Sequence, residues 1–93
     1  MIRSFRGKEA QGLYERRPVR RLPVSIHRVA LRKLTQIDAA TALDDLRATP
    51  GNRLEKLVGD RAGQHSIRIN DQWRVCFRWV NGDALDVEIV DYH

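Results

Sequence analysis

The sequence predicts a small α+β domain in which two helices from the first half of the chain pack on one face of an antiparallel sheet from the second half. Between residues 25 and 37 apolar residues recur with the period of an amphipathic helix. From residue 53 onward they recur at every second position, as in strands with one buried face. Turn signals separate these strands, so neighbouring strands pair as hairpins. The predicted order of elements is βααββββ.

Length and composition favour one folded domain over residues 1–93. A chain of 93 residues has room for one modest core, and 42% hydrophobic residues are enough to fill it. No apolar run is long enough to span a bilayer and the amino terminus lacks a signal-like apolar block, so we expect a cytoplasmic protein. The single Cys76 lies in a strand-like segment and is expected to be a buried thiol. The spacing of Cys and His predicts no zinc site, and no cofactor is expected.

The predicted elements before residue 25 are short. Residues 1–5 read as a first strand with Ile2 buried. Residues 8–16 read as a weak helix with a narrow apolar stripe, which Pro18 ends. A basic loop is expected to connect it to the next element.

A stronger second helix follows, with Ser25 as its predicted N-cap. Its apolar stripe consists of Ile26, Val29, Ala30, Leu34 and Ile37. The same spacing predicts that the polar side chains face solvent: His27, Arg28, Arg32, Lys33 and Gln36. Residues 42–47 can add one more helical turn, and the turn signal at residues 49–52 closes the helical half.

Strands are predicted over residues 53–58, 65–69, 73–79 and 85–90. Asn81-Gly82 is the favoured two-residue hairpin turn between the last two. Because side chains alternate between faces, the large apolar residues of these two strands are predicted to face the helices: Trp73, Val75, Phe77, Trp79, Leu85, Val87 and Ile89. The same alternation turns three cations to the opposite face: Arg68, Arg74 and Arg78.

The last three residues, Asp91, Tyr92 and His93, follow directly on the last predicted strand. A carboxylate, a phenol and an imidazole at a strand end are held better than a frayed tail, and all three can move or orient protons. The arginines of the preceding strands are cations suited to phosphate. The second half of the chain therefore offers phosphate-binding cations beside acid/base groups.

Positive charge is concentrated in the first third of the chain. Residues 1–33 hold ten Lys or Arg residues against two acidic ones, a net charge of +8, while residues 34–93 hold seven against ten, a net charge of −3. Such a surface attracts polyanions, above all nucleic acid. The cations expected to contact RNA are Arg16, Arg17, Arg20, Arg21, Arg28, Arg32 and Lys33. The alternatives are a solvated helix face and a surface covered by an acidic partner.

Four stretches of the second half match a known family: residues 51–55 (GNRLE), 59–70 (GDRAGQHSIRIN), 72–77 (QWRVCF) and 87–93 (VEIVDYH). They resemble the HigB-type toxins, the plasmid maintenance killer proteins of the RelE-like superfamily. The resemblance extends from Ile2 to the end of the chain and is looser over residues 6–50. It implies a small microbial-ribonuclease-like fold, in which two helices pack on one face of a curved antiparallel sheet.

The resemblance also implies an activity, partners and a site. Members of the family are toxins of type II toxin–antitoxin modules that cut mRNA on the translating ribosome, and a helix-turn-helix antitoxin of the HigA type silences them. Arg74 is then expected to hold the scissile phosphate while a ribose 2′-hydroxyl attacks phosphorus, a reaction that needs no metal. His93 suits either proton transfer near pH 7, Tyr92 can orient or donate a proton, and Asp91 can fix the imidazole or hold the chain end.

One stretch departs from the family pattern. Several relatives carry Leu-His-Pro-Leu-Lys-Gly where this chain reads Leu-Glu-Lys-Leu-Val-Gly at residues 54–59, so two proton-handling cations are missing. Glu55 is the candidate general base in their place, since a carboxylate near arginines stays ionised. The alternative is a surface carboxylate paired with Arg53 or Arg61.

Other strand residues have both a functional and a structural interpretation. Arg68 and His65 are secondary candidates for RNA contact, although His65 is equally explained as a satisfied strand histidine. For Arg74 and Arg78 the structural alternative is cross-strand pairing with acidic residues, namely Asp86 and Glu88.

Three functions from different classes fit these observations. The first is the ribosome-dependent mRNA endonuclease, favoured by the chain end and the arginines of the sheet. The second is a non-enzymatic toxin on the same scaffold that inhibits DNA gyrase through protein contacts. The third is a basic RNA-binding module, which would need exposed aromatic residues for stacking, whereas Trp73, Phe77 and Trp79 are assigned to the core.

Overall fold

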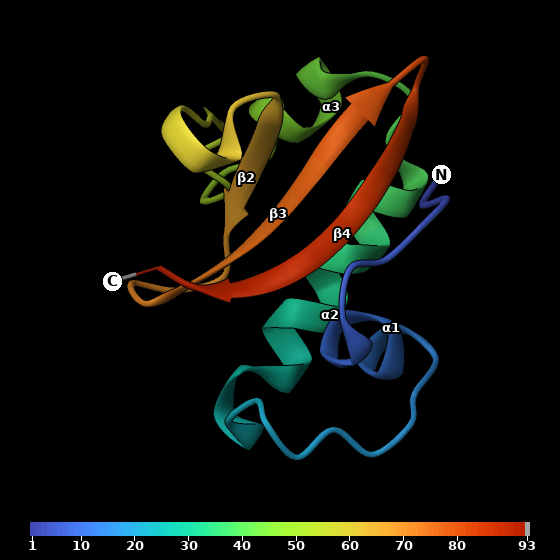
Figure 1. Cartoon of the computed structure of the whole chain (residues 1–93), viewed down its shortest axis with the longest axis vertical. Coiled ribbons are helices and arrows are strands. Elements are labelled where there is room, and N and C mark those ends of the chain that lie inside the picture. The colour runs from blue at the N-terminus through green and yellow to red at the C-terminus, as the bar shows by residue number, and fades with distance from the viewer. Residues whose placement is uncertain (93) are drawn as a thin grey trace.

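The computed structural model describes residues 1–92 and confirms the predicted α+β class (Figure 1). Three helices come first in the chain: α1 (Lys8–Tyr14), α2 (Val24–Ala39) and α3 (Leu43–Ala48). Four strands follow: β1 (Glu55–Lys56), β2 (Gln64–Arg68), β3 (Trp73–Val80) and β4 (Asp83–Asp91). They form one antiparallel sheet in the order β1-β2-β3-β4, with a 3₁₀ turn at Gly59–Arg61 between the first two. No helix within these residues is long and apolar enough to cross a membrane.

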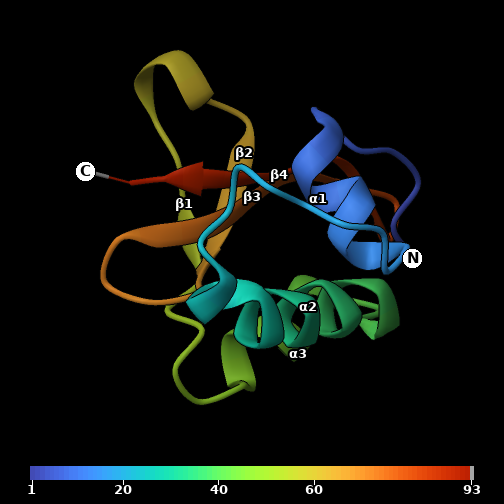
Figure 2. The same ribbon diagram turned by 90° about the horizontal axis from the view of Figure 1, so that it is seen from below.

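The helices cover one face of the sheet, with α1 and α2 packed against β4 (Figure 2). The predicted stripe of α2 forms the contact, since Ile26, Ala30, Leu34 and Ile37 are buried. The helix begins two residues earlier than expected, at Val24 with Pro23 as its N-cap, so the prediction of Ser25 as N-cap is wrong. Proline supplies a suitable backbone angle at a helix start without any capping side chain.

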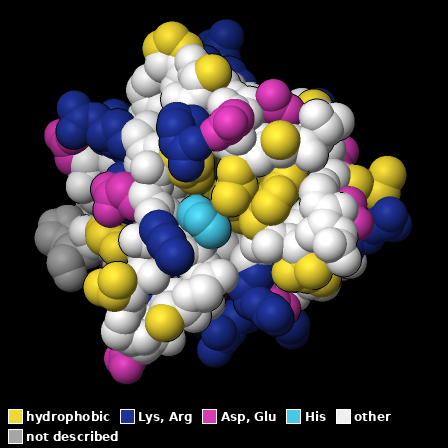
Figure 3. Space-filling model, turned by 90° about the horizontal axis from the view of Figure 1, so that it is seen from above, with side chains coloured by type: hydrophobic (Ala, Val, Ile, Leu, Met, Phe, Trp, Pro, Cys, Tyr) yellow, Lys and Arg dark blue, Asp and Glu magenta, His cyan; other side chains and the backbone are white. Residues whose placement is uncertain are grey.

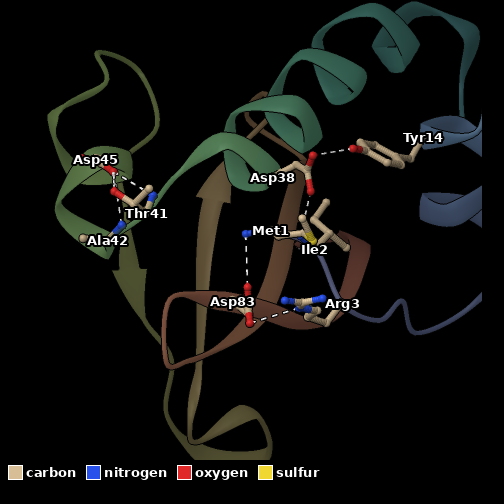
Figure 4. Close-up of polar contacts among 9 residues, drawn as sticks. All are labelled: Met1, Ile2, Arg3, Tyr14, Asp38, Thr41, Ala42, Asp45 and Asp83. Carbon is tan, nitrogen blue, oxygen red and sulfur yellow. Dashed lines mark hydrogen bonds and ion pairs between the residues drawn. The ribbon is translucent and has the colours of Figure 1, made fainter.

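The first five residues pair with β4, but only through two isolated parallel bridges, Ile2 to Ala84 and Phe5 to Val87. The expected strand over residues 1–5 therefore does not form, and only these two bridges remain. Asp38 at the end of α2 holds this segment, because its carboxylate accepts hydrogen bonds from the Ile2 amide at 2.8 Å and the Tyr14 hydroxyl at 2.7 Å (Figure 4). These bonds lower the pKa of Asp38 and raise that of Tyr14.

A β-bulge interrupts the alternation of β4. Cys76 pairs with Glu88 while Arg78 pairs with Leu85, so Phe77 faces two residues of β4 instead of one. The extra residue is Asp86, whose φ of 53° lies in the left-handed region and whose amide bonds to Ser4 Oγ at 2.8 Å. The bulge places Ala84, Val87 and Ile89 in the core. The prediction that Leu85 shares that face is wrong, and Leu85 is only half-buried.

The core lies between the helices and the inner face of the sheet. Phe77, Val75 and Ile67 are fully buried there, as the alternation predicts, while Trp73 and Trp79 lie half-buried at its margins. Cys76 is also buried, and burial raises the pKa of its thiol, which confirms the inert thiol expected from the sequence. With the inner face filled, the outer face of the sheet is left for function.

Candidate active site

Arg74 is buried on the outer face of the sheet, where its guanidinium is held from several sides. Its Nε donates to Ser66 Oγ at 2.7 Å, and its Nη2 donates to the Arg53 carbonyl oxygen at 2.6 Å. Ser66 and Arg74 lie on neighbouring strands, because Ser66 pairs with Cys76 and Arg68 pairs with Arg74. The Arg74 side chain is only 8% exposed, and the hydrogen bonds from two of its nitrogens hold it in one orientation. Because these two acceptors are neutral, they do not cancel the positive charge of the guanidinium.

Glu55 on β1 brings a carboxylate to this charge. Its Oε1 lies 3.4 Å from Arg74 Nη1, and half of the Glu55 side chain is exposed. Arg61, which the sequence offered as a partner for Glu55, pairs instead with Glu88 at 3.1 Å. The structure thus brings Glu55 to Arg74, as the general-base hypothesis requires, rather than leaving it as a surface pair with Arg53 or Arg61.

Tyr92 closes the site from the carboxyl end of β4. Arg74 Cζ lies 5.6 Å from the centroid of the Tyr92 ring, which is within the range of a cation–π contact. The Tyr92 amide donates to the Gln72 carbonyl oxygen at 2.6 Å, and the Asp91 carboxylate accepts from Gln72 Nε2 at 3.0 Å. These bonds confirm that residues 91 and 92 are held at the strand end. His93, the third predicted residue of this segment, lies outside the described residues.

Asp91 is placed to hold the chain end. It pairs with Trp73 across the strands, whereas Arg74 pairs with Val90, so Asp91 does not share the face of Arg74. Its carboxylate bonds to Gln72, in the turn that precedes β3. Of the two roles that the sequence left open for Asp91, this geometry favours support of the tail.

Arg68 and Arg78 share the outer face with Arg74 but have acidic partners. Arg68 pairs with Asp71 in the following turn, and Arg78 lies 3.5 Å from Asp86. Arg78 therefore forms the cross-strand ion pair with Asp86 that the sequence offered as its structural alternative. Arg74 differs from both, because its partners are a hydroxyl, backbone carbonyls and one half-exposed carboxylate.

His65 does not belong to this site. It pairs with Phe77 across the strands and stacks on that ring, with 6.3 Å between centroids, on the inner face of the sheet. Burial, and then the charges of Lys56 and Arg47, lower the pKa of His65, which favours the neutral imidazole. The sheet therefore separates His65 from Arg74, and the expected contact of His65 with RNA stays a prediction. Its Nδ1 is buried and has no hydrogen-bond partner within residues 1–92.

The basic residues of the first third fall into two groups. Six of them are exposed on α2 and on the segment before it: Arg16, Arg17, Arg20, Arg21, Arg28 and Arg32. Lys33 is only 5% exposed, so the prediction that it faces solvent and contacts RNA is wrong. On the side of the molecule drawn in Figure 3, Lys and Arg side chains stand in several separate groups among acidic and apolar ones.

Reasoning from the sequence missed two contributors to the site, Ser66 and the Arg53 carbonyl, and it also missed the burial of Lys33. Ser66 could have been found, because strand alternation puts it on the face of Arg68 and Arg74. Lys33 also left a signal, since it lies seven residues after Ile26, two helical turns along the buried stripe. A backbone carbonyl leaves no sequence signal of its own.

Comparisons with known proteins identify the family of the chain and give the same fold. Residues 3–93 match the model of a family described as the RelE-like toxin of type II toxin–antitoxin system HigB. The chain is 46% identical over 87 residues to Toxin HigB-1 of Vibrio cholerae, covering 92% of each chain. It is 36% identical over 94 residues to Endoribonuclease HigB of Proteus vulgaris, covering 100% of each.

A solved structure gives the same fold. The YoeB-YefM complex from Staphylococcus aureus aligns with a TM-score of 0.58 over 100% of this chain and 98% of that one, at 18% identity. The fold is thus that of a RelE-like protein. The chain belongs to the HigB toxin family of type II toxin–antitoxin systems.

Proposed function

We propose that the protein is an endoribonuclease that cleaves mRNA on the ribosome, without a metal ion, and that Arg74 binds the scissile phosphate. The observation that carries this proposal is the fixed guanidinium of Arg74 with Glu55 on one side and Tyr92 on the other. A preorganised positive charge beside groups that can transfer protons is what cleavage of the RNA backbone requires. The relative named Endoribonuclease HigB, which aligns over its full length, supports the same activity.

In the proposed reaction the ribose 2′-oxygen attacks the adjacent phosphorus and the bond from phosphorus to the 5′-oxygen breaks. The 2′-hydroxyl loses its proton to a base, for which Glu55 is the candidate, and the leaving 5′-oxygen gains a proton from an acid. The products are a 2′,3′-cyclic phosphate and a 5′-hydroxyl. Arg74 neutralises the pentacoordinate phosphorane, which carries more negative charge than the substrate.

The acid in this proposal comes from the chain end. His93 is suited to the role on chemical grounds, because an imidazole can donate a proton near pH 7. The Tyr92 hydroxyl is the second candidate, since its ring lies against the arginine that would bind the phosphate. Asp91 then supports the tail through Gln72 rather than taking part in proton transfer.

Dependence on the ribosome follows from the sparse acid/base groups of the site. With a glutamate in place of the histidine and lysine of several relatives, the enzyme must obtain much of its rate from substrate that is already well oriented. A ribosome holds its mRNA in a fixed path, and the exposed arginines of the first third are suited to gripping ribosomal RNA. Free RNA should then be a poor substrate.

A HigA-type antitoxin is the proposed protein partner, and the cytoplasm the proposed compartment. The family is defined by a toxin–antitoxin system, so a toxin of this kind is made together with a protein that neutralises it. Ribosomes and mRNA, the other two proposed partners, are found in the same compartment.

The direct test is cleavage of a defined mRNA by the purified protein, with and without programmed ribosomes. We expect cuts only with ribosomes present, ends that carry a 2′,3′-cyclic phosphate, and full activity after treatment with a metal chelator that leaves the ribosomes intact. Inhibition of DNA gyrase without any RNA cleavage would favour the non-enzymatic alternative. Equal cleavage of free RNA would contradict the dependence on the ribosome.

A further inference from the structure

Lys33 on α2 makes a buried hydrogen bond to the loop that precedes β1. Its Nζ donates to Asn52 Oδ1 at 2.5 Å, and both residues are buried, with exposures of 5% and 0%. Asn52 Nδ2 in turn donates to the Leu46 carbonyl oxygen of α3 at 3.1 Å. One asparagine side chain therefore ties the loop to two helices.

The backbone of the same loop is tied to the sheet and to Arg74. The Arg68 amide donates to the Asn52 carbonyl oxygen at 2.7 Å, and the next carbonyl, that of Arg53, accepts from Arg74 Nη2 at 2.6 Å. Arg53 has a φ of 46°, a left-handed conformation that a non-glycine residue adopts only when its surroundings hold it there. A continuous path of contacts thus runs from Lys33 through Asn52 and Arg53 to the guanidinium of Arg74.

A buried lysine at position 33 loses hydration, and that cost in free energy would be unnecessary if residue 33 only packed in the core. Burial lowers the pKa of Lys33, and Arg32 and Arg68 lower it further, so the charge is not stabilised by its surroundings. Residue 33 also lies on the buried stripe of α2, where an apolar side chain would pack without losing hydration. What lysine adds at this position is a hydrogen bond that reaches the Asn52 side chain.

We propose that Lys33 and Asn52 are positioning residues, which fix the Arg53 carbonyl and through it the orientation of the Arg74 guanidinium. This inference rests on the proposed function, in which Arg74 binds the scissile phosphate. Because a displacement of about 1 Å at a catalytic group can lower a rate by roughly 100-fold, a loop held from α2 and α3 matters to the reaction without touching the RNA.

Lys33→Met is the central test, with two independent readouts. Rotation of the Arg74 guanidinium is read by NMR from its Nη resonances, and kcat and KM are measured on programmed ribosomes. We expect faster rotation at Arg74 and a kcat about 10- to 100-fold lower, with KM nearly unchanged because ribosome binding is not altered. Asn52→Asp keeps the acceptor for Lys33 but loses the Nδ2 donor to the Leu46 carbonyl oxygen, so the rotation rate of Arg74 should lie between those of the wild type and Lys33→Met.

Ile37→Val serves as a matched control, since it weakens the buried face of the same helix and its side chain makes no hydrogen bond to the loop. It should lower the melting temperature and leave both Arg74 readouts unchanged. If Lys33→Met does not fold, the double variant with Asn52→Leu removes both ends of the Lys33–Asn52 hydrogen bond, takes the donor only from the Leu46 carbonyl oxygen, and is read in the same way.

The outcomes separate this inference from the proposed function. Unchanged Arg74 resonances in Lys33→Met, with only a lower melting temperature, would overturn the positioning role. Faster rotation of Arg74 with wild-type cleavage would uphold the positioning role and instead refute the function assigned to Arg74.

Discussion

The guanidinium of Arg74 lies over the aromatic ring of Tyr92, with 5.6 Å between Arg74 Cζ and the ring centroid. The two meet because β4 pairs with β3 up to Asp91 and because the Tyr92 amide bonds to the Gln72 carbonyl oxygen. Arg74 is buried, whereas 43% of Tyr92 is exposed, so the ring is the solvent-facing part of the pair. The end of the chain and the proposed phosphate-binding residue therefore form one unit.

The first prediction concerns Arg74. Arg74→Ala removes the preorganised charge that would stabilise the phosphorane, so cleavage on ribosomes should fall by about two orders of magnitude or more. The measurement is the single-turnover rate on programmed ribosomes. Arg78→Ala is the matched control, because Arg78 lies on the same face but pairs with Asp86, and it should retain most of the activity. Growth arrest by Arg74→Ala at wild-type expression would rule out the proposed role.

The second prediction concerns Glu55. If its carboxylate accepts the proton of the 2′-hydroxyl, Glu55→Gln should lower kcat by about 100-fold or more, with ribosome binding unchanged. Glu55→Asp should recover part of the rate, since the carboxylate remains but lies one methylene further back. A wild-type kcat in Glu55→Gln would mean that Glu55 serves only as a counter-charge for Arg74.

The third prediction concerns the chain end. Deletion of residues 92 and 93 removes no core side chain among the residues that the structure describes, so the melting temperature should change little while mRNA cleavage is abolished. Circular dichroism and the ribosome assay measure the two effects separately. The proposed mechanism fails if the truncated protein still cleaves mRNA.

The variants Tyr92→Phe and Tyr92→Ala distinguish the role of the Tyr92 hydroxyl from that of its aromatic ring. Phenylalanine keeps the ring beside Arg74 and loses the hydroxyl, whereas alanine loses both. Loss of cleavage in both variants would indicate proton transfer or orientation by the hydroxyl, and loss in Tyr92→Ala alone would indicate a packing role.

The fourth prediction concerns the exposed arginines of the first third. Changing Arg20, Arg21, Arg28 and Arg32 to Gln should weaken ribosome association and flatten its salt dependence by about one slope unit for each phosphate that is no longer neutralised. Cosedimentation at several salt concentrations gives that slope.

A charge-matched control distinguishes a specific surface from total charge. Changing Arg6, Lys8, Arg47 and Lys56 to Gln removes the same charge from exposed positions elsewhere. We expect this variant to keep the wild-type salt slope. If both variants show the same salt slope of ribosome association, these four arginines do not form a specific ribosome-binding surface. They would then serve only in solubility or in binding the antitoxin.

The fifth prediction concerns pH and Asp38. The folded state lowers the pKa of this carboxyl, chiefly through the hydrogen bond from the Ile2 amide. The resulting stability is complete above the ordinary carboxyl pKa of about 4 and is lost as pH falls through the lower pKa of the folded state. Urea unfolding between pH 6 and 2 should therefore show a smaller loss of stability in Asp38→Asn than in the wild type, by about 1 kcal/mol.

The pKa values of Asp45 and Asp83 are also lowered, by hydrogen bonds from Thr41 and Arg3 respectively. Asp45 and Asp83 make the free energy of unfolding depend on pH in the same way in the wild type and in Asp38→Asn. Only the difference between the two stability–pH curves therefore reports on Asp38. Parallel curves would show that the Asp38 bonds to Ile2 and Tyr14 contribute little to folding.

Local periodicity accounts for what the sequence could predict. The stripe of α2 and the outward position of Arg74 follow from helical and strand repeats, which depend only on neighbours in the chain. The hairpin at Asn81-Gly82 was predictable because asparagine and glycine tolerate the positive φ that this turn requires, and both residues have a positive φ in the structure. The cluster at the site followed from the family resemblance, and strand register brings its members Arg74 and Glu55 together.

What the sequence could not predict depends on partners distant in the chain. The segment from Leu85 to Ile89 alternates without a break, yet Asp86 bulges because Ser4 binds its amide. Lys33 has the charge of a surface residue, and its partner Asn52 is 19 positions away in the sequence. The bulge leaves no local pattern that distinguishes it from regular alternation, and the place of Lys33 on the buried stripe does not identify Asn52 as its partner.

The pairing of residues 1–5 with β4 bears on when this protein can fold. Residues 1–5 find their partners, Ala84 and Val87, in β4, on the far side of all three helices and the other three strands in the sequence. Contacts of such long sequence separation form late, because closing a loop of nearly the whole chain costs entropy before any bond is gained. We therefore expect residues 1–5 to dock on β4 late in folding, after the β3–β4 hairpin has formed, so that a refolding experiment should detect this contact after the sheet.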